Sequence, residues 1–140
     1  MQLTSIEKID TPTAGAPPRH EVVERTFAGR SGTREERTLE LCEAMIDIAA
    51  ALFNVSGKDL RKPGRSSLGV SRVRQVAMYV CHVVLRLNMS DIGKAFGRDR
   101  TTVVHACHLI EDLRDDRDFE RIITTTERVA LAAFGRRIGL

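Results

Sequence analysis

Five consecutive polar residues stand where an apolar helix is expected to begin: Arg98, Asp99, Arg100, Thr101 and Thr102. Arginine side chains pair with the acceptors of guanine or with backbone phosphates. The free N–H groups and the positive dipole end of a helix N-terminus also favour phosphate. These residue types in this position therefore indicate contact with a nucleic acid.

The helix that follows this cluster is expected to run from Asp99 to about Arg114 and to have two different faces. Its apolar stripe consists of Val103, Ala106, Cys107, Ile110 and Leu113. At about 100° per residue, the opposite face carries Thr101, His105, His108 and Asp112. We expect Asp99 to cap the helix through Thr102 N–H, which leaves open a role as an acceptor from cytosine.

A shorter helix is expected directly before this one. Ser90 is a plausible N-cap for a helix over residues 91–96, and Gly97 ends it. A short helix, a tight glycine-containing turn and a longer helix form a helix-turn-helix arrangement. In that geometry the N-terminal part of the second helix enters the major groove of DNA.

Charge is distributed unevenly along the chain, although the net charge is only +3. Residues 61–74 contain five basic residues and no acid: Arg61, Lys62, Arg65, Arg72 and Arg74. Residues 111–120 contain six acids and two arginines. This asymmetry suits a polyanionic partner. Two solvated surface patches are an equally good reading of charge alone.

The remaining pattern predicts an all-α fold. Amphipathic spacing predicts helices over residues 35–53, 73–87 and 118–134, and residues 61–72 read as a basic loop because of Pro63, Gly64 and Gly69. No alternating strand pattern is found. The expected organisation is a flexible arm over residues 1–34, a helical domain over residues 35–135 and a tail over residues 136–140.

Several other classes of protein are not expected. Cys42, Cys81 and Cys107 lie in apolar helical patterns and read as reduced, buried thiols. A metal site at His105, Cys107 and His108 is disfavoured because one helix cannot direct all three at one ion. The chain has no phosphate loop, no poised nucleophile, no bilayer-spanning segment and no secretion signal. We therefore expect a cytoplasmic, nucleoid-associated non-enzyme without a cofactor.

Residues 36–134 resemble the C-terminal DNA-binding domain of the bacterial replication initiator DnaA. The matching segments are SRVRQVAMYV (71–80), SDIGKAFG (90–97), RDRTTVVHAC (98–107) and IEDLR (110–114). The resemblance implies a helical domain with a helix-turn-helix and a basic loop that recognises a short DNA element.

The resemblance also implies roles for individual residues. Arg72 would reach the minor groove, and Asp99, Arg100, Thr101 and Thr102 would meet the major groove. The basic positions Arg61, Lys62, Arg65, Arg74 and Lys94 would contact or approach phosphates.

The sequence departs from the family pattern at three positions. Only Gly97 precedes the Arg-Asp pair, where the family usually has two glycines. Arg100 stands where the family has a histidine, and a longer cation favours guanine or phosphate, so the target sequence is expected to differ. Val73 stands where the family often has proline.

The expected partner is double-stranded DNA. The protein would act as a transcriptional regulator, or as a modulator of replication initiation that occupies or competes for the sites of an initiator. The alternative is a protein-interaction module of the same fold that binds an initiator or another partner instead of DNA. The sequence leaves the oligomeric state open.

Overall fold

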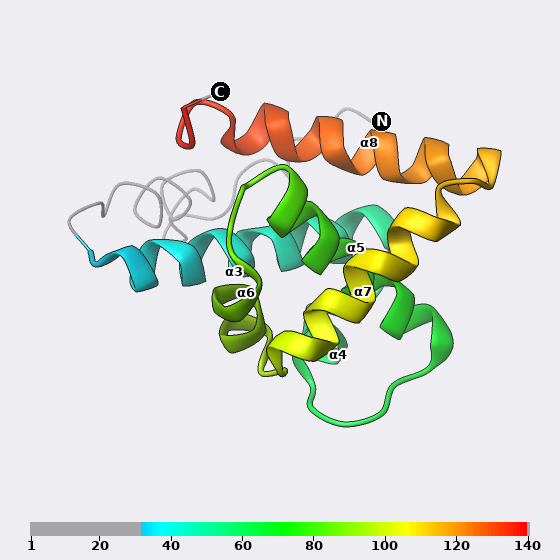
Figure 1. Cartoon of the computed structure of the whole chain (residues 1–140), viewed down its shortest axis with the longest axis horizontal. Coiled ribbons are helices and arrows are strands. Elements are labelled where there is room, and N and C mark those ends of the chain that lie inside the picture. Colours follow the sequence, from blue (N-terminus) through cyan, green and yellow to red (C-terminus); the bar gives the residue numbers. More distant parts are fainter. Residues whose placement is uncertain (1–31, 140) are drawn as a thin grey trace, which may run out of the picture. The chain divides into compact units, whose positions relative to one another are not determined.

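The computed structural model describes residues 32–139, and this part of the chain contains helices and no strand (Figure 1). The helices are α3 (Arg34–Phe53), α4 (Gly57–Arg61), α5 (Leu68–Val83), α6 (Met89–Phe96), α7 (Arg100–Leu113) and α8 (Arg117–Phe134). The all-α prediction is confirmed for these residues. Residues 1–31 of the expected arm lie outside the described part, and Arg34, assigned to that arm, is the first residue of α3. No described helix is long and apolar enough to cross a membrane.

Helix α3 begins and ends at local signals in its sequence. The Thr33 hydroxyl accepts the Glu36 N–H at 3.1 Å, and the Glu36 carboxylate accepts the Thr33 N–H at 2.7 Å, which is a capping box. Asn54 ends the helix in the left-handed conformation. Cys42, Met45, Ile46 and Ala49 form its buried face. Helical spacing in the sequence also predicts Leu39 and Leu52 on this apolar face, but both residues are exposed.

Helix α5 packs against α3 and α7 and supplies the centre of the core. Val76, Ala77, Val80 and Cys81 are buried on it. It starts at Leu68 because the Ser67 hydroxyl caps it by accepting the Val70 N–H at 3.3 Å. The expected loop over residues 61–72 is therefore too long at both ends. Arg61 belongs to α4, and the connection between α4 and α5 spans residues 62–67.

Helices α6 and α7 form the predicted helix-turn-helix. Asn88, rather than Ser90, caps α6 by accepting the Asp91 N–H at 2.8 Å. Gly97 ends α6 with a left-handed φ of 67°. The Arg98 N–H donates to the Gly93 carbonyl at 2.8 Å. A Cβ atom at Gly93 would lie 2.6 Å from the Arg98 carbonyl oxygen, so the tight turn requires glycine there.

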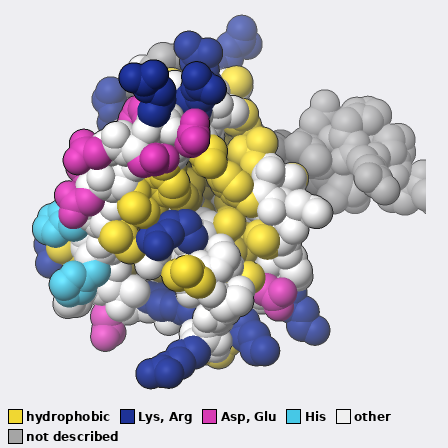
Figure 2. All heavy atoms as spheres, turned by 90° about the vertical axis from the view of Figure 1, so that its right-hand side faces the viewer, with side chains coloured by type: hydrophobic (Ala, Val, Ile, Leu, Met, Phe, Trp, Pro, Cys, Tyr) yellow, Lys and Arg dark blue, Asp and Glu magenta, His cyan; other side chains and the backbone are white. Residues whose placement is uncertain are grey.

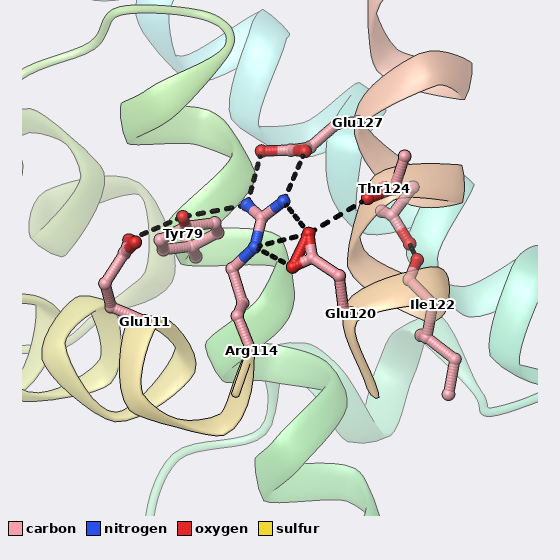
Figure 3. A network of polar contacts seen from close by, with 8 residues as sticks. Tyr79, Glu111, Arg114, Glu120, Ile122, Thr124 and Glu127 are labelled. Carbon is pink, nitrogen blue, oxygen red and sulfur yellow. Dashed lines mark hydrogen bonds and ion pairs between the residues drawn. The ribbon is translucent and has the colours of Figure 1, made fainter. Parts of the chain in front are cut away.

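A polar network around Arg114 joins α5, α7 and α8 (Figure 3). Arg114 donates to Glu120, to Glu127 at 3.0 Å and to the Tyr79 hydroxyl at 3.0 Å. Tyr79 in turn donates to Glu111 at 2.6 Å. The hydrogen bond to Glu120 is the main reason that the pKa of Arg114 is raised, and Arg114 holds the pKa of Glu120 below its ordinary value. Burial raises the pKa of Tyr79 to about 12, and its bond to Glu111 acts in the same direction.

Helix α8 runs across the top of Figure 1 and contacts α3 and α5. Ile123, Thr126, Ala130 and Phe134 are buried on it. The sequence pattern of this helix predicts that Ile122 and Ile123 are both buried, but Ile122 is exposed. The buried stripe of α8 therefore passes through Ile123 rather than Ile122, because α3 and α5 cover only one narrow face of the helix.

Candidate nucleic-acid interface

The first turn of α7 is open to solvent. Arg100, Thr101 and Thr102 are all exposed, as is the N-cap residue Asp99. The expected cap between the Asp99 carboxylate and Thr102 N–H is wrong: Asp99 has the extended backbone of an N-cap but makes no side-chain cap hydrogen bond. The N–H groups of a helix's first turn have no partner within the helix. This end of α7 therefore offers guanidinium, hydroxyl and backbone donors together.

The two faces of α7 divide as the sequence predicts, except that Leu113, the last residue of the predicted apolar stripe, is half-buried. Val103, Ala106, Cys107 and Ile110 are buried. Thr101, His105, His108 and Asp112 are exposed. Because Cys107 is buried on one face and the histidines are exposed on the other, these three residues do not converge. No described group of His, Cys, Asp and Glu side chains is arranged to hold a metal ion.

The cysteines lie inside the described helices as free thiols. Burial raises the pKa of Cys107 to about 11. The pKa of Cys81 is raised well above its ordinary value, mainly by its contact with Cys42. Cys81 and Cys107 are therefore held in their neutral form. All three buried cysteines pack as small apolar groups.

Arg98 connects the helix-turn-helix to the basic loop. Its guanidinium donates to the carbonyl oxygens of Lys62 at 3.2 Å, Gly64 at 3.4 Å and Phe96 at 3.3 Å. The sequence predicted Arg98 only as a groove contact and missed this role. It could not be read from the sequence, since the loop carbonyls lie 34 and 36 positions away along the chain. The contacts hold residues 62–64 beside the start of α7.

Arg74 anchors the other side of the same loop. The resemblance implies that Arg74 contacts or approaches a phosphate, but the residue is only 5% exposed. Its guanidinium donates to the Leu60 carbonyl at 2.9 Å, the Asp59 carbonyl at 3.0 Å and the Ser66 hydroxyl at 2.8 Å. Burial, followed by the charge of Arg98, lowers the pKa of Arg74. A buried guanidinium is tolerated here because oxygen acceptors surround it.

The other predicted cations differ in whether they form hydrogen bonds or ion pairs within the protein. Arg61 pairs with Glu43 and Asp47 of α3, and its bond to Glu43 is the main reason that its pKa is raised. Arg72 is half-buried and donates to Gln75 at 3.0 Å. The remaining predicted cations, Lys62, Arg65 and Lys94, are exposed.

Two hollows lie on either side of Thr102, so α6, α7 and the basic loop form one continuous surface. The larger, of about 470 Å³, lies against α6 and the turn and includes Lys94 and Asp99. The other, of about 400 Å³, lies between the loop and α7 and includes Arg65 and His105.

Charged side chains of both signs lie on this side of the molecule. The loop of residues 62–67 lies at the bottom of Figure 1, and Figure 2, turned about the vertical axis, shows Lys and Arg side chains gathered at the lower edge. Most of the Asp and Glu side chains lie higher on the same face, and a second group of Lys and Arg side chains lies at its top (Figure 2). The cations at the lower edge would give a polyanion a favourable potential there.

Comparisons with known proteins agree with this arrangement. Residues 42–110 match the sequence profile of the family described as the bacterial DnaA protein helix-turn-helix. The chromosomal replication initiator protein DnaA of Lachnoclostridium phytofermentans is 35% identical over 88 residues, which cover 61% of this chain and 18% of that protein.

Solved structures show the same fold. A DNA replication initiation factor matches with a TM-score of 0.64 and 26% identity, over 82% of this chain and 36% of that one. The replication initiator DnaA bound to AMPPCP and single-stranded DNA matches with a TM-score of 0.64 and 24% identity, over 81% of this chain and 35% of that one. The chain thus spans about a fifth of the curated relative and about a third of the solved ones. Residues 42–110 of the chain therefore belong to the DnaA helix-turn-helix family.

Proposed function

We propose that this domain binds double-stranded DNA in a sequence-specific manner, with the first turn of α7 in the major groove. The open, cationic first turn of α7, placed beside an anchored basic loop, is the observation that supports this function best. Membership of the DnaA helix-turn-helix family supports the same reading. The biological role proposed is regulation of transcription or modulation of replication initiation at sites shared with an initiator.

Base recognition is assigned to the exposed side chains of the first two turns of α7. Arg100 can pair with the N7 and O6 acceptors of guanine, and Asp99 can accept from the amino group of cytosine. Thr101, Thr102 and His105 extend this surface along the helix. Arg100 also sets the preferred sequence apart from one read by a histidine at this position, because a guanidinium is a bidentate donor and reaches further.

Phosphate contact is assigned to the exposed cations around this surface, namely Lys62, Arg65 and Lys94. Arg72 stands at the loop side and is proposed to reach the minor groove, for which it must release Gln75. Arg61, Arg74 and Arg98 already donate to protein oxygens. Their proposed part is to hold the loop in position, together with whatever attraction their charge exerts on DNA at a distance.

The test is selection of binding sites from random duplexes, followed by titration of the selected duplex over a range of salt concentrations. The expected result is one enriched element and an affinity that falls steeply with salt, because each neutralised phosphate releases counterions. Lys62→Ala and Arg65→Ala should each weaken binding to all duplexes alike and lower the slope of log affinity against log salt by about 1. An affinity for the duplex that does not change with salt concentration, or the absence of any enriched DNA element, would overturn the proposal. A gel shift that shows little difference with and without duplex, together with co-purification of a partner, would favour a protein-interaction module of the same fold.

A further inference from the structure

A second cationic pocket lies at the opposite end of α6 from the helix-turn-helix turn. Its volume is about 300 Å³, and it is enclosed by the start of α3, the α5–α6 connection, the start of α6 and the turn after α8. Four of its lining residues are arginines: Arg34, Arg37, Arg86 and Arg137. The acids facing this group are Asp91, which pairs with Arg34, and Glu40, whose carboxylate is 3.9 Å from Arg137.

Arg86 occupies a backbone position that favours glycine. Its φ is 60°, in the left-handed region. The Leu87 N–H donates to the Cys81 carbonyl at 3.2 Å. This hydrogen bond closes the C-terminal end of α5. Glycine is the common residue at the left-handed position of such helix ends because it has no Cβ penalty. The fold therefore has no need of an arginine at this position, and its side chain stands exposed at the pocket.

Arg34 is also placed against a local preference. It is the first residue of α3, where the positive end of the helix dipole disfavours a cation. Its guanidinium donates to the Asp91 carboxylate at 3.2 Å, and its side chain is 72% exposed whereas that of Asp91 is 14% exposed. Asp91 also accepts from Asn88 at 2.9 Å. Asp91 thus holds the Arg34 guanidinium over the first turn of α6 without enclosing it.

The path of α6 connects this pocket to the proposed DNA surface. In helix-turn-helix proteins the first helix crosses the DNA backbone. A helix of the length of α6 spans about 12 Å, which is close to the width of about 12 Å of the major groove. With the Gly97 turn at the groove, the start of α6 lies near one sugar-phosphate strand. Lys94 is exposed on the same helix, nearer the turn.

We propose that Arg34 and Arg86 bind a backbone phosphate of the same duplex, outside the base pairs that face α7. This inference rests on the proposed function. Guanidinium groups suit it because their planar donors match phosphate oxygens. The contact adds affinity without reading sequence, since phosphates are the same at every base pair. A phosphorylated small molecule would use the same chemistry, but the additional exposed cation Lys94, which lies on α6 between this pocket and the turn, favours a continuous strand.

The test variant is Arg86→Gly, because glycine suits this backbone and the melting temperature should stay the same or rise. Binding to the selected duplex and to a random duplex is measured by fluorescence anisotropy against salt. We expect both affinities to fall by the same factor, about eightfold at about 0.1 M salt, with a slope lower by about 0.9. Arg86→Lys, which keeps the charge, should keep the wild-type slope. Arg128→Ala on α8 removes the same charge elsewhere and should leave the slope unchanged.

Shortened duplexes locate the contact. Base pairs are removed from either end of the selected duplex while the enriched element is kept. Removal from one end should abolish the difference between wild type and Arg86→Gly, and removal from the other end should preserve it. A difference that survives both truncations would contradict a flanking phosphate contact.

Further outcomes distinguish a failure of this inference from a failure of the proposed DNA-binding function. If Arg86→Gly binds DNA like the wild type while Arg100→Ala changes sequence preference, the inference is wrong and the proposed function stands. If the wild type shows no salt-dependent duplex binding, both the inference and the proposed function are wrong. Loss of binding to AMP or inorganic phosphate in Arg86→Gly, with unchanged DNA binding, would assign the pocket to a small ligand and overturn the inference.

Discussion

At the scale of single residues, the arginines near the proposed interface have different surroundings. Arg74 and Arg98 direct their guanidinium groups at carbonyl oxygens of residues 59–64, and Arg61 pairs with α3. Arg100 is exposed in the first turn of α7. A guanidinium holds five donors in a rigid fork, so acceptors within the protein fix its orientation. The guanidinium of Arg100 can therefore contact a ligand, whereas those of Arg74, Arg98 and Arg61 support the structure of the protein.

Arg100→Ala tests recognition. We expect a loss of about 1–3 kcal/mol for duplexes with the preferred base pair at one position, and little loss for the others, because a bidentate base contact is removed. Competition by duplexes with each position of the selected element varied in turn measures this. The matched control is Arg117→Ala, which removes an exposed arginine from the first position of α8 instead of α7. An equal loss for every duplex would make Arg100 a phosphate contact.

At the scale of elements, the interface depends on a loop that is held from both sides. Arg98 reaches the loop from the helix-turn-helix turn, and Arg74 reaches it from α5. The six residues of the connection, 62–67, have no helix or strand of their own. Their position beside α7 therefore comes from these side-chain hydrogen bonds, so the geometry of the interface should respond to their loss.

Arg98→Ala tests the support of the loop. We expect faster amide hydrogen exchange in residues 62–67 and weaker binding to all duplexes, with a stability loss of about 1–3 kcal/mol from the lost charged hydrogen bonds. Exchange measured by mass spectrometry or NMR separates this from a contact effect. Arg100→Ala, two positions along, should leave the exchange of the loop unchanged. A loop that exchanges as in the wild type would show that Arg98 does not hold it.

Gly93→Ala tests the close approach inside the helix-turn-helix. The added Cβ would meet the Arg98 carbonyl oxygen at 2.6 Å. We expect the free energy of unfolding to fall by about 1–3 kcal/mol, as for other overpacked sites. The control is Gly69→Ala in α5, where a Cβ meets nothing within 4 Å. It should raise stability by about 0.4–1 kcal/mol by restricting the unfolded chain. Urea unfolding measures both, and equal effects would contradict the steric argument.

At the scale of the whole domain, the Arg114 network fixes the acidic end of the molecule. It ties α8 to α5 and α7 through Tyr79, Glu120 and Glu127 (Figure 3). Figure 2 shows the acidic side chains above the cationic lower edge. The network also couples stability to pH.

Arg114 lowers the pKa of Glu120 in the folded state. A carboxylate with a depressed folded pKa stabilises the fold above its unfolded pKa, about 4.3. That contribution is lost as the pH falls through the lower folded value. We expect the free energy of unfolding to decline in this acidic range, and Glu120→Gln to remove part of the decline while being less stable than the wild type at neutral pH. The difference between the two proteins should vanish in acid.

Urea unfolding at a series of pH values measures this dependence. Asp112→Asn, an exposed acid outside the network, removes the same charge and should keep the wild-type decline. If Glu120→Gln and the wild type show parallel curves, Glu120 does not contribute to the pH dependence.

Local sequence signals predicted the elements and one surface of the interface. The spacing of Val103, Ala106, Cys107 and Ile110 predicted the buried stripe of α7, and Gly97 predicted the end of α6. These features follow from helical periodicity and backbone conformation, which involve neighbouring residues only. The start of α5 was missed although Ser67 is a good N-cap, because Pro63 and Gly69 made the whole segment read as loop.

The sequence by itself thus determined an all-α domain with a helix-turn-helix, and it brought Arg100, Thr101 and Thr102 to the start of a helix. Only the tertiary structure decided which cations are exposed there. Arg98 binds a carbonyl 36 positions away, and Arg74 one that is 14 positions away. The sequence shows that an arginine is charged. Its hydrogen-bond acceptors depend on which distant backbone carbonyls the packing of the helices brings within reach.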